Sequence, residues 1–265
     1  MILVQLVPGL PGGKWALLRP LCGHDETRVD AGSLAQGVAL LDRLLVDSPG
    51  TSVGPGRASE LAVSDGDRLF AAIYFEYFGE WVEGVATCRQ CGSSFAVSFS
   101  LKEMAAEMDA PGSQQAVGPD QNGVYTLSDG RRFRLPTCGD QQSVMGLDLE
   151  EGASLLRNRC IVEGNPAEDP VLLQAGMSEV GPVLDQELQT VCPDCGVLES
   201  VRFDVQRHLL HTLAREKRFL VREVHLIALA YGWGYEEILD IPRQERRDFV
   251  ALIQAERESE KGRGR

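Results

Sequence analysis

Four cysteines in two pairs carry the clearest chemistry in this sequence. Cys88 and Cys91 are separated by two residues, and Cys192 and Cys195 repeat that spacing about a hundred residues later. A two-residue spacer lets both sulfurs of a pair face one cation, and the glycine that follows each pair permits the positive φ that such a turn needs. Four thiolates complete the tetrahedral shell of Zn²⁺, so the spacing predicts a structural zinc site rather than a catalytic one.

A disulfide pair or a redox CxxC motif is the alternative use of these cysteines. Redox motifs usually occur singly in a βαβ setting, whereas both pairs here lie between extended apolar segments. Those segments are Trp81 to Thr87, Phe95 to Phe99, Glu187 to Val191 and Val197 to Phe203. This layout predicts a zinc ribbon whose metal closes a loop of about a hundred residues.

The composition describes a folded, acidic protein. Its hydrophobic content is 43%, its net charge is −13 and its pI is about 4.8. Such a charge argues against a nucleic-acid partner, which ordinarily needs a basic face. The sequence contains no run of 18 apolar residues, so we expect no membrane span, and the apolar start from Met1 to Val7 is expected to be a strand.

Three cysteines remain outside the two pairs, namely Cys22, Cys138 and Cys160. We expect them to be buried thiols in a reducing compartment, which indicates a cytosolic protein.

The fold class expected is α+β, with short strands and hairpins around the zinc ribbon and a mainly helical C-terminal region. A hairpin is predicted at Val124 to Leu127 and Arg131 to Leu135, because Asp129 and Gly130 suit a tight turn. The predicted domains are residues 1–109 with the first cysteine pair, a linker or mobile loop at 110–123, residues 124–204 with the second pair, and helices over 205–265.

Helix signals follow the chain. Ser33 is expected to cap a helix that ends near Asp47, and Ser100 to begin a short helix through a capping box. The aromatic residues of the predicted helix over 68–78 are expected in the core. The C-terminal apolar stripe predicts helices with a break near Lys217, a reversal at Trp233 and a final helix.

Two segments of the chain resemble each other. The stretch from Leu135 to Asp140 matches that from Arg19 to Asp25 at an offset near 116, and apolar helical segments follow both. The similarity predicts a degenerate internal duplication whose halves each carry one cysteine pair, with chance similarity as the alternative.

Two further groups could do chemistry. His208 and His211 share a helix face and could join Cys160 in a second metal site, although we expect solvated or locally satisfied histidines. His24 beside Asp25 and Glu26 suggests acid–base work. No convergent nucleophile or cofactor loop accompanies them, so we predict no enzyme and no small-molecule substrate.

Three stretches resemble one protein family. They run from Leu21 to Glu26, from Leu135 to Asp140 and from Glu223 to Arg247, and the last ends in a tryptophan turn and an I-L-x-[LI]-P-x-x-x-R-R helix. They are similar to the baseplate hub and hub-assembly proteins of contractile-tailed bacteriophages and of related extracellular contractile injection systems, some of which carry two cysteine knuckles.

The resemblance implies a structural or assembly role in a baseplate, with other baseplate or hub proteins as partners. We expect the protein in the bacterial or host cytoplasm during assembly, with the finished tail particle as a second location. Trp233 must pack against neighbouring helices or insert into a partner, and core packing is favoured. Arg243, Arg246 and Arg247 begin a candidate docking helix over 241–255, with a solvated charged face as the alternative. A zinc-ribbon regulator or adaptor in nucleic-acid processing is the alternative function.

Overall fold

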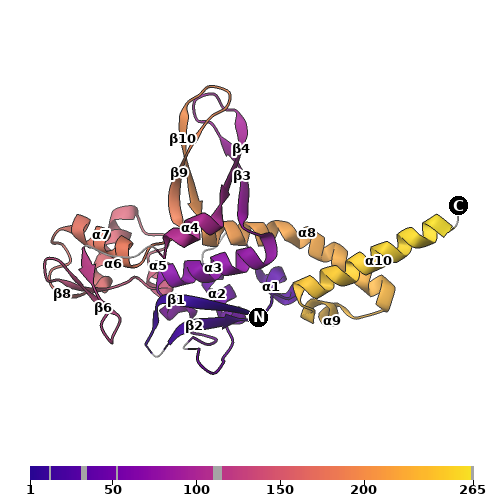
Figure 1. The fold of residues 1–265 in the computed structure, drawn as a ribbon, viewed down its shortest axis with the longest axis horizontal. Coiled ribbons are helices and arrows are strands. Elements are labelled where there is room, and N and C mark those ends of the chain that lie inside the picture. The colour runs from indigo at the N-terminus through magenta and orange to yellow at the C-terminus, as the bar shows by residue number, and fades with distance from the viewer. Residues whose placement is uncertain (12, 31–34, 52, 110–114, 264–265) are drawn as a thin grey trace.

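The computed structural model describes residues 1–11, 13–30, 35–51, 53–109 and 115–263. The fold is mixed α+β with short antiparallel strand pairs and a helical C-terminal region, as predicted. Figure 1 shows a central body from which an arm of two hairpins projects, with a small sheet lobe at one end and a helical lobe at the other.

The body contains the main hydrophobic core. The body is built from β1 (Ile2–Leu10), β2 (Gly13–Leu18), α1 (Gly23–Arg28), α2 (Ala35–Leu44), the 3-10 helix η1 (Ala58–Glu60), α3 (Val63–Phe78) and α4 (Leu101–Glu107), and the first part of α8 (Val205–Tyr231) packs into the same core. β1 pairs antiparallel with β2 and packs on α3, so the apolar start of the chain is a strand, as expected. The expected cap at Ser33 lies outside the described residues.

Aromatic residues of α3 fill this core. Phe70 and Tyr74 are buried, which confirms the core role predicted for them. The hydroxyl of Tyr77 accepts a hydrogen bond of 2.8 Å from the backbone N–H of Leu21 and so ties α3 to the entry of α1. The predicted N-cap of α4 is present, because the Ser100 hydroxyl accepts from the backbone of Glu103, but the return bond from the Glu103 side chain that a capping box requires is not found among the described residues.

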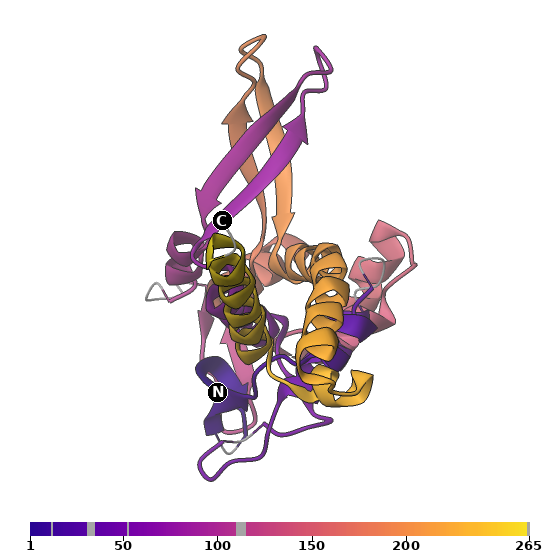
Figure 2. The same ribbon diagram turned by 90° about the vertical axis from the view of Figure 1, so that its right-hand side faces the viewer.

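The arm consists of two two-stranded hairpins that lie side by side (Figure 2). One contains β3 (Trp81–Thr87) and β4 (Ser94–Ser100), and the other contains β9 (Asp185–Val191) and β10 (Leu198–Asp204). All four strands fall where the sequence predicts them. At the base, the rings of Phe99 and Phe203 meet edge to face at 4.8 Å and join the two hairpins to the body.

A four-stranded sheet in the order β5-β6-β7-β8 forms the small lobe. Its elements are β5 (Ala116–Val117), β6 (Val124–Leu127), β7 (Arg132–Arg134), α5 (Cys138–Ser143), α6 (Leu149–Cys160), β8 (Ile161–Glu163) and α7 (Pro170–Val180). The predicted hairpin is confirmed, with Gly130 at φ 92° in its turn. Of the predicted linker, residues 110–114 lie outside the described residues, whereas β5 is an ordered strand that pairs with β6. The linker prediction is therefore corrected for the part that is described.

The helical lobe is formed by α8 (Val205–Tyr231), α9 (Tyr235–Asp240) and α10 (Arg243–Arg263). α8 is continuous, so the break expected near Lys217 is absent. Lysine is a good helix former, and Glu216 and Glu223 hold this part of α8 against α10 through ion pairs. Gly232, at φ 72°, ends the helix as predicted.

The two similar sequence segments form the same ion pair. Arg19 donates from both terminal nitrogens to Asp25 at 2.7 and 2.9 Å, and Arg134 does so to Asp140 at 2.6 and 3.2 Å. Burial raises the pKa of Asp140, but the hydrogen bonds from Arg134 and from the backbone outweigh it and lower that pKa to about 2. Both carboxylates are therefore ionised and held at a helix start.

The surroundings of these pairs also match. A second arginine reaches each carboxylate at 3.4 Å, Arg43 in the first segment and Arg159 in the second. The residue before each short helix forms an isolated bridge with a residue just before a long helix: Cys22 with Pro242, and Thr137 with Ala62. Each segment thus anchors the start of a helix that belongs to the other part of the chain.

A buried charge cluster joins the two ends of the chain. Glu26, 1% exposed, accepts from both Arg243 and Arg246, which are 2% and 0% exposed. Arg246 also donates to Glu223 at 2.6 Å, and Arg243 to Glu216 at 2.7 Å. These contacts clamp α1 between α8 and α10.

This geometry corrects the prediction for the C-terminal arginines. The carboxylates that Arg243 and Arg246 pair with are supplied by the same chain, so these two guanidinium groups do not face another subunit. Arg247 is half-buried and bonds to Glu216 at 2.5 Å. Trp233 stacks on Tyr231 and meets Phe249 edge to face, while 37% of it stays exposed.

Asp67 is a second buried charge that joins distant parts of the chain. Its carboxylate accepts a hydrogen bond of 2.7 Å from the backbone of Leu184, just before β9. Burial raises the pKa of Asp67 to about 7, and the neighbouring Asp204 and Asp185 add to this effect.

No helix among the described residues is both long enough and apolar enough to cross a membrane.

We predict that Arg246→Ala lowers the free energy of unfolding by about 3–5 kcal/mol, because it leaves Glu26 and Glu223 buried with fewer partners. Urea unfolding measures the loss. The control is Lys102→Ala, which removes an exposed pair with Glu80 and should cost under about 1 kcal/mol. Equal costs for the two variants would contradict the role given to the cluster.

Asp67 predicts a pH dependence of stability. Its folded pKa of about 7 lies above the ordinary value of 3.8, so this group destabilises the fold progressively as pH rises between those values. Asp67→Asn should therefore be more stabilising, relative to the parent, at pH 8 than at pH 5 by on the order of 2 kcal/mol. Denaturant unfolding of both proteins at the two pH values measures it, and a pH-independent difference would contradict the burial argument.

Candidate metal centre

The two cysteine turns lie at the tip of the arm, one on each hairpin. In each turn the glycine after the second cysteine has a positive φ, 75° at Gly92 and 72° at Gly196. Its N–H bonds back to the carbonyl of the first cysteine, Cys88 at 3.0 Å and Cys192 at 2.9 Å. Both turns therefore have the same backbone geometry, and the positive φ expected from the sequence is confirmed.

The four sulfurs form one compact group. Their Sγ atoms all lie within 4.8 Å of one another. Between hairpins, Cys88 is 3.6 Å from Cys195 and Cys91 is 3.7 Å from Cys192. A tetrahedral ion with metal–sulfur bonds of about 2.3 Å separates its sulfurs by about 3.8 Å, so the four thiols fit such an ion. These cysteines could bind a metal ion, and no other such group of histidine, cysteine or carboxylate ligands is found in the described part of the chain.

A small apolar cluster supports the ligands from below. Cys88 and Cys192 are each 1% exposed and pack with Phe95, whereas Cys91 and Cys195 are exposed at the tip. Because two-stranded hairpins are marginally stable on their own, an ion that bridges the two tips would hold the arm together.

Glu199 is a site residue that the sequence analysis missed. It lies on the inner face of β10, accepts from the backbone of Arg89 at 2.8 Å and stands 3.2 Å from the Cys88 sulfur. It therefore links the second hairpin to the first cysteine turn. A signal was present in the sequence, because Glu199 alternates with Val197, Val201 and Phe203 at positions that are otherwise apolar.

The thiols of the cluster differ in pKa. The backbone hydrogen bonds at Cys88 favour a thiolate, but burial and the hydrogen bonds with Glu199 and Cys91 outweigh them and raise the pKa of Cys88 to about 12, whereas the pKa of Cys91 is shifted the other way. The Ser93 hydroxyl and backbone, as donors to the Cys91 sulfur, lower the pKa of Cys91 to about 6. Metal ligation requires the thiolate, so this cysteine is prepared for it near neutral pH.

The second metal site considered from the sequence does not form. His208 packs between the rings of Tyr74 and Phe203, and burial lowers its pKa. His211 is exposed on α8. Cys160 is buried at the end of α6 and is not grouped with either histidine.

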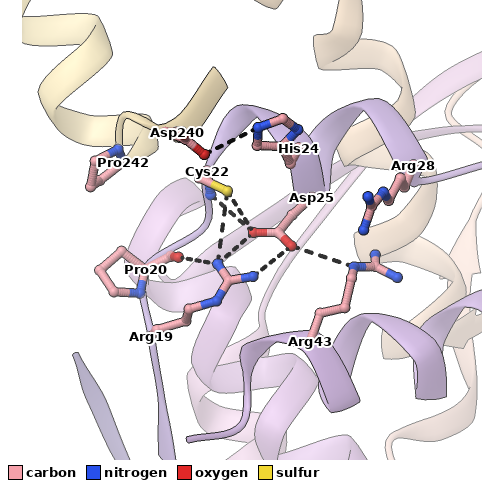
Figure 3. Close-up of a pocket in the computed structure, with 9 residues that line it drawn as sticks. All are labelled: Arg19, Pro20, Cys22, His24, Asp25, Arg28, Arg43, Asp240 and Pro242. Atoms are coloured by element: carbon pink, nitrogen blue, oxygen red, sulfur yellow. Dashed lines mark hydrogen bonds and ion pairs between the residues drawn. The ribbon is translucent and has the colours of Figure 1, made fainter. Parts of the chain in front are cut away.

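His24 and Asp25 line a pocket of about 530 Å³ at the start of α1 (Figure 3), whereas Glu26 is not one of its lining residues. The Asp25 carboxylate is occupied by Arg19 and Arg43, and Glu26 is buried in the charge cluster, so neither has a free oxygen for proton transfer. His24 lies 3.2 Å from Asp240. The three residues adjacent in sequence thus have three separate sets of partners.

The remaining cysteines differ in burial. Cys138 and Cys160 are buried, as predicted, and burial raises the pKa of Cys138 to about 12. Cys22 is partly exposed, which corrects the expectation for it, and its sulfur lies 3.3 Å from Asp25.

The chain matches no protein-family model, no curated protein and no solved structure in the comparisons made with each.

We predict that the chain binds one tetrahedral divalent ion and that Cys192→Ser abolishes this binding. Structural ions of this kind contribute on the order of 10 kcal/mol coupled to folding, so the loss should also lower the melting temperature. Elemental analysis and the absorption of Co²⁺-loaded protein measure the ion. Cys22→Ser is the control, because its thiol lies outside the cluster, and it should keep one ion per chain. An ion retained in Cys192→Ser would contradict the four-cysteine set.

Proposed function

We propose that the chain is a zinc-stabilised, non-catalytic structural or assembly component of a contractile, phage-tail-like baseplate that acts through protein–protein contacts. The observation that carries the proposal is the four-cysteine group at the tip of an arm whose two hairpins come from distant parts of the chain. An arm built in this way is suited to hold a shape and present a surface.

Zinc is the ion that this ligand set favours. Soft thiolates select Zn²⁺ among the common divalent ions, and four of them leave no coordination position for a reacting water. The two glycine turns, each on its own hairpin, support a zinc ribbon. In this proposal the ion is structural, and it replaces the apolar core that so thin an arm lacks.

The baseplate part of the proposal rests on the sequence resemblance, and one contact supports it. Two of the three tracts that carry the resemblance, Leu21 to Glu26 and Glu223 to Arg247, are about two hundred residues apart in the chain. These two tracts meet in the buried cluster, where Glu26 bonds to Arg246 and Arg246 bonds to Glu223. Tracts selected by resemblance alone thus form one structural unit, as a shared fold requires.

The fold limits which residues of the proposed C-terminal docking helix a partner could contact. Because Arg243 and Arg246 are committed inside the chain, a partner would meet the exposed parts of Trp233, Arg247 and Leu252. α10 extends away from the body, so this end of the lobe is open to a second protein (Figure 1).

We also propose that the chain arose by internal duplication. The matching arginine–aspartate pairs and the exchanged helix-start bridges support it, because chance similarity would not reproduce side-chain geometry at two positions. Assembly in the bacterial or host cytoplasm suits the thiols that the ion requires.

Co-expression tests the function. The tagged chain, made together with the baseplate and hub proteins of a contractile tail from the same genome, is expected to co-purify with at least one of them. Cys192→Ser should co-purify less, since its arm lacks the ion. Failure of the zinc-loaded chain to co-purify, together with sub-micromolar gel-shift binding to nucleic acid at about 150 mM salt, would favour the regulator instead.

A further inference from the structure

The face of α8 that points away from the body carries a row of basic side chains. Arg207, Arg215, Arg218 and Arg222 are all exposed, and no acidic residue lies among them on this face. At 100° per residue they fall within an arc of about 80°, and they extend over about 22 Å of helix. His211 and His225 are exposed on the same arc. We call these four arginines the arginine row.

The arginine row has no partner in the described part of the chain. None of its guanidinium groups forms a side-chain hydrogen bond or an ion pair with a described residue, although Arg218 lies over the neighbouring Phe219 ring at 4.7 Å. Several arginines outside the row are paired, including Arg202 with Asp185 and Arg132 with Glu163. The acidic residues of α8, Glu216 and Glu223, face α10 instead.

The charge of the row contrasts with that of the chain. The chain carries −13, so the residues outside the row carry −17, since −13 minus +4 is −17. Four positive charges in line on one helix, none in an ion pair with a described residue, therefore form a local feature of a strongly acidic molecule, although the charge of Arg207 also acts on Asp204. Burial lowers the pKa of the nearby His208, and electrostatic interactions with His211 and Arg215 lower it further.

We propose that the arginine row is a docking surface for an acidic segment of a partner protein, one that presents carboxylates at a spacing of one helical turn. Planar guanidinium groups pair with carboxylates in a bidentate way, and arginine is enriched at protein interfaces. The row is flanked by the exposed apolar side chains of Phe219 and Val221, 39% and 70% exposed, which a protein partner can cover. This inference does not depend on the baseplate assignment.

A protein partner fits better than a phosphate polymer or a membrane. Nucleic acid and anionic lipid are extended polyanions that would meet the acidic remainder of the chain as well as the row. A single acidic helix or strand matches the length and the narrow arc of the row and can leave the rest of the surface untouched.

The test uses the full zinc-loaded chain and two labelled helical peptides of equal composition. One carries glutamates at i, i+4, i+7 and i+11, and the other carries them scattered around the helix. Fluorescence anisotropy should show tighter binding of the first peptide, and Arg215→Glu with Arg218→Glu should weaken it at least tenfold. The matched control is Lys14→Glu with Lys102→Glu, which makes the same change in net charge away from α8 and should leave the affinity unchanged.

Other outcomes overturn the proposal. Equal affinity for the two peptides would show that binding depends only on net charge. An equal loss of affinity in the control variant would show the same. Tighter binding to a DNA oligonucleotide or to phosphatidylserine vesicles, lost in the charge-reversed variant, would assign the row to phosphate. Self-association of the chain lost in that variant would assign it to a second copy. Because all the altered side chains are exposed, we expect each variant to fold, and an unchanged circular dichroism spectrum would confirm it.

Discussion

The burial of Glu26 is the constraint on which the arrangement of the helices depends. A carboxylate that is 1% exposed is costly unless positive donors surround it, and Arg243 and Arg246 supply them from the far end of the chain. Satisfying this one charge fixes α10 against α1. It also turns Glu216 and Glu223 of α8 inward, toward the same arginines.

The orientation of α8 has a consequence at its opposite face. An amphipathic helix whose apolar and acidic positions are both engaged on one side must present its remaining positions to solvent. In α8 those positions carry arginine, so the exposed basic face is the counterpart of the buried cluster. The ion pairs that bury Arg243 and Arg246 inside the chain also orient α8 so that Arg215 and Arg218 are exposed and can contact another protein.

The arm differs from the body in how much apolar packing it contains. It has little apolar material of its own, chiefly Phe95 near the tip and the Phe99–Phe203 contact at the base. A pair of two-stranded hairpins needs more than this to be stable, and four thiols at the tip offer the missing cross-link. The body is held by apolar packing and buried charge, whereas the arm carries four thiols that could bind a metal ion across its two hairpins.

Local features of this protein were determined by the sequence itself. The strands around the cysteine turns, the positive φ at Gly92 and Gly196, the turn at Gly130 and the cap at Ser100 were all predicted, because each depends on a few neighbouring residues. The four cysteines that could bind a metal ion were named for the same reason, since the two-residue spacing within each pair lets both sulfurs face one ion.

Tertiary structure decided which charges are buried and which are free. Nothing near Arg243 in the sequence indicates that Glu26, more than two hundred residues earlier, will neutralise it. Arg243 and Arg246, two residues of the candidate docking helix, therefore proved to be internal. The helix break expected at Lys217 was prevented by the same long-range ion pairs, and Glu199 acquires its role only when two distant hairpins meet. Contacts between distant segments depend on how the whole chain packs. The local sequence pattern around one residue therefore does not predict them.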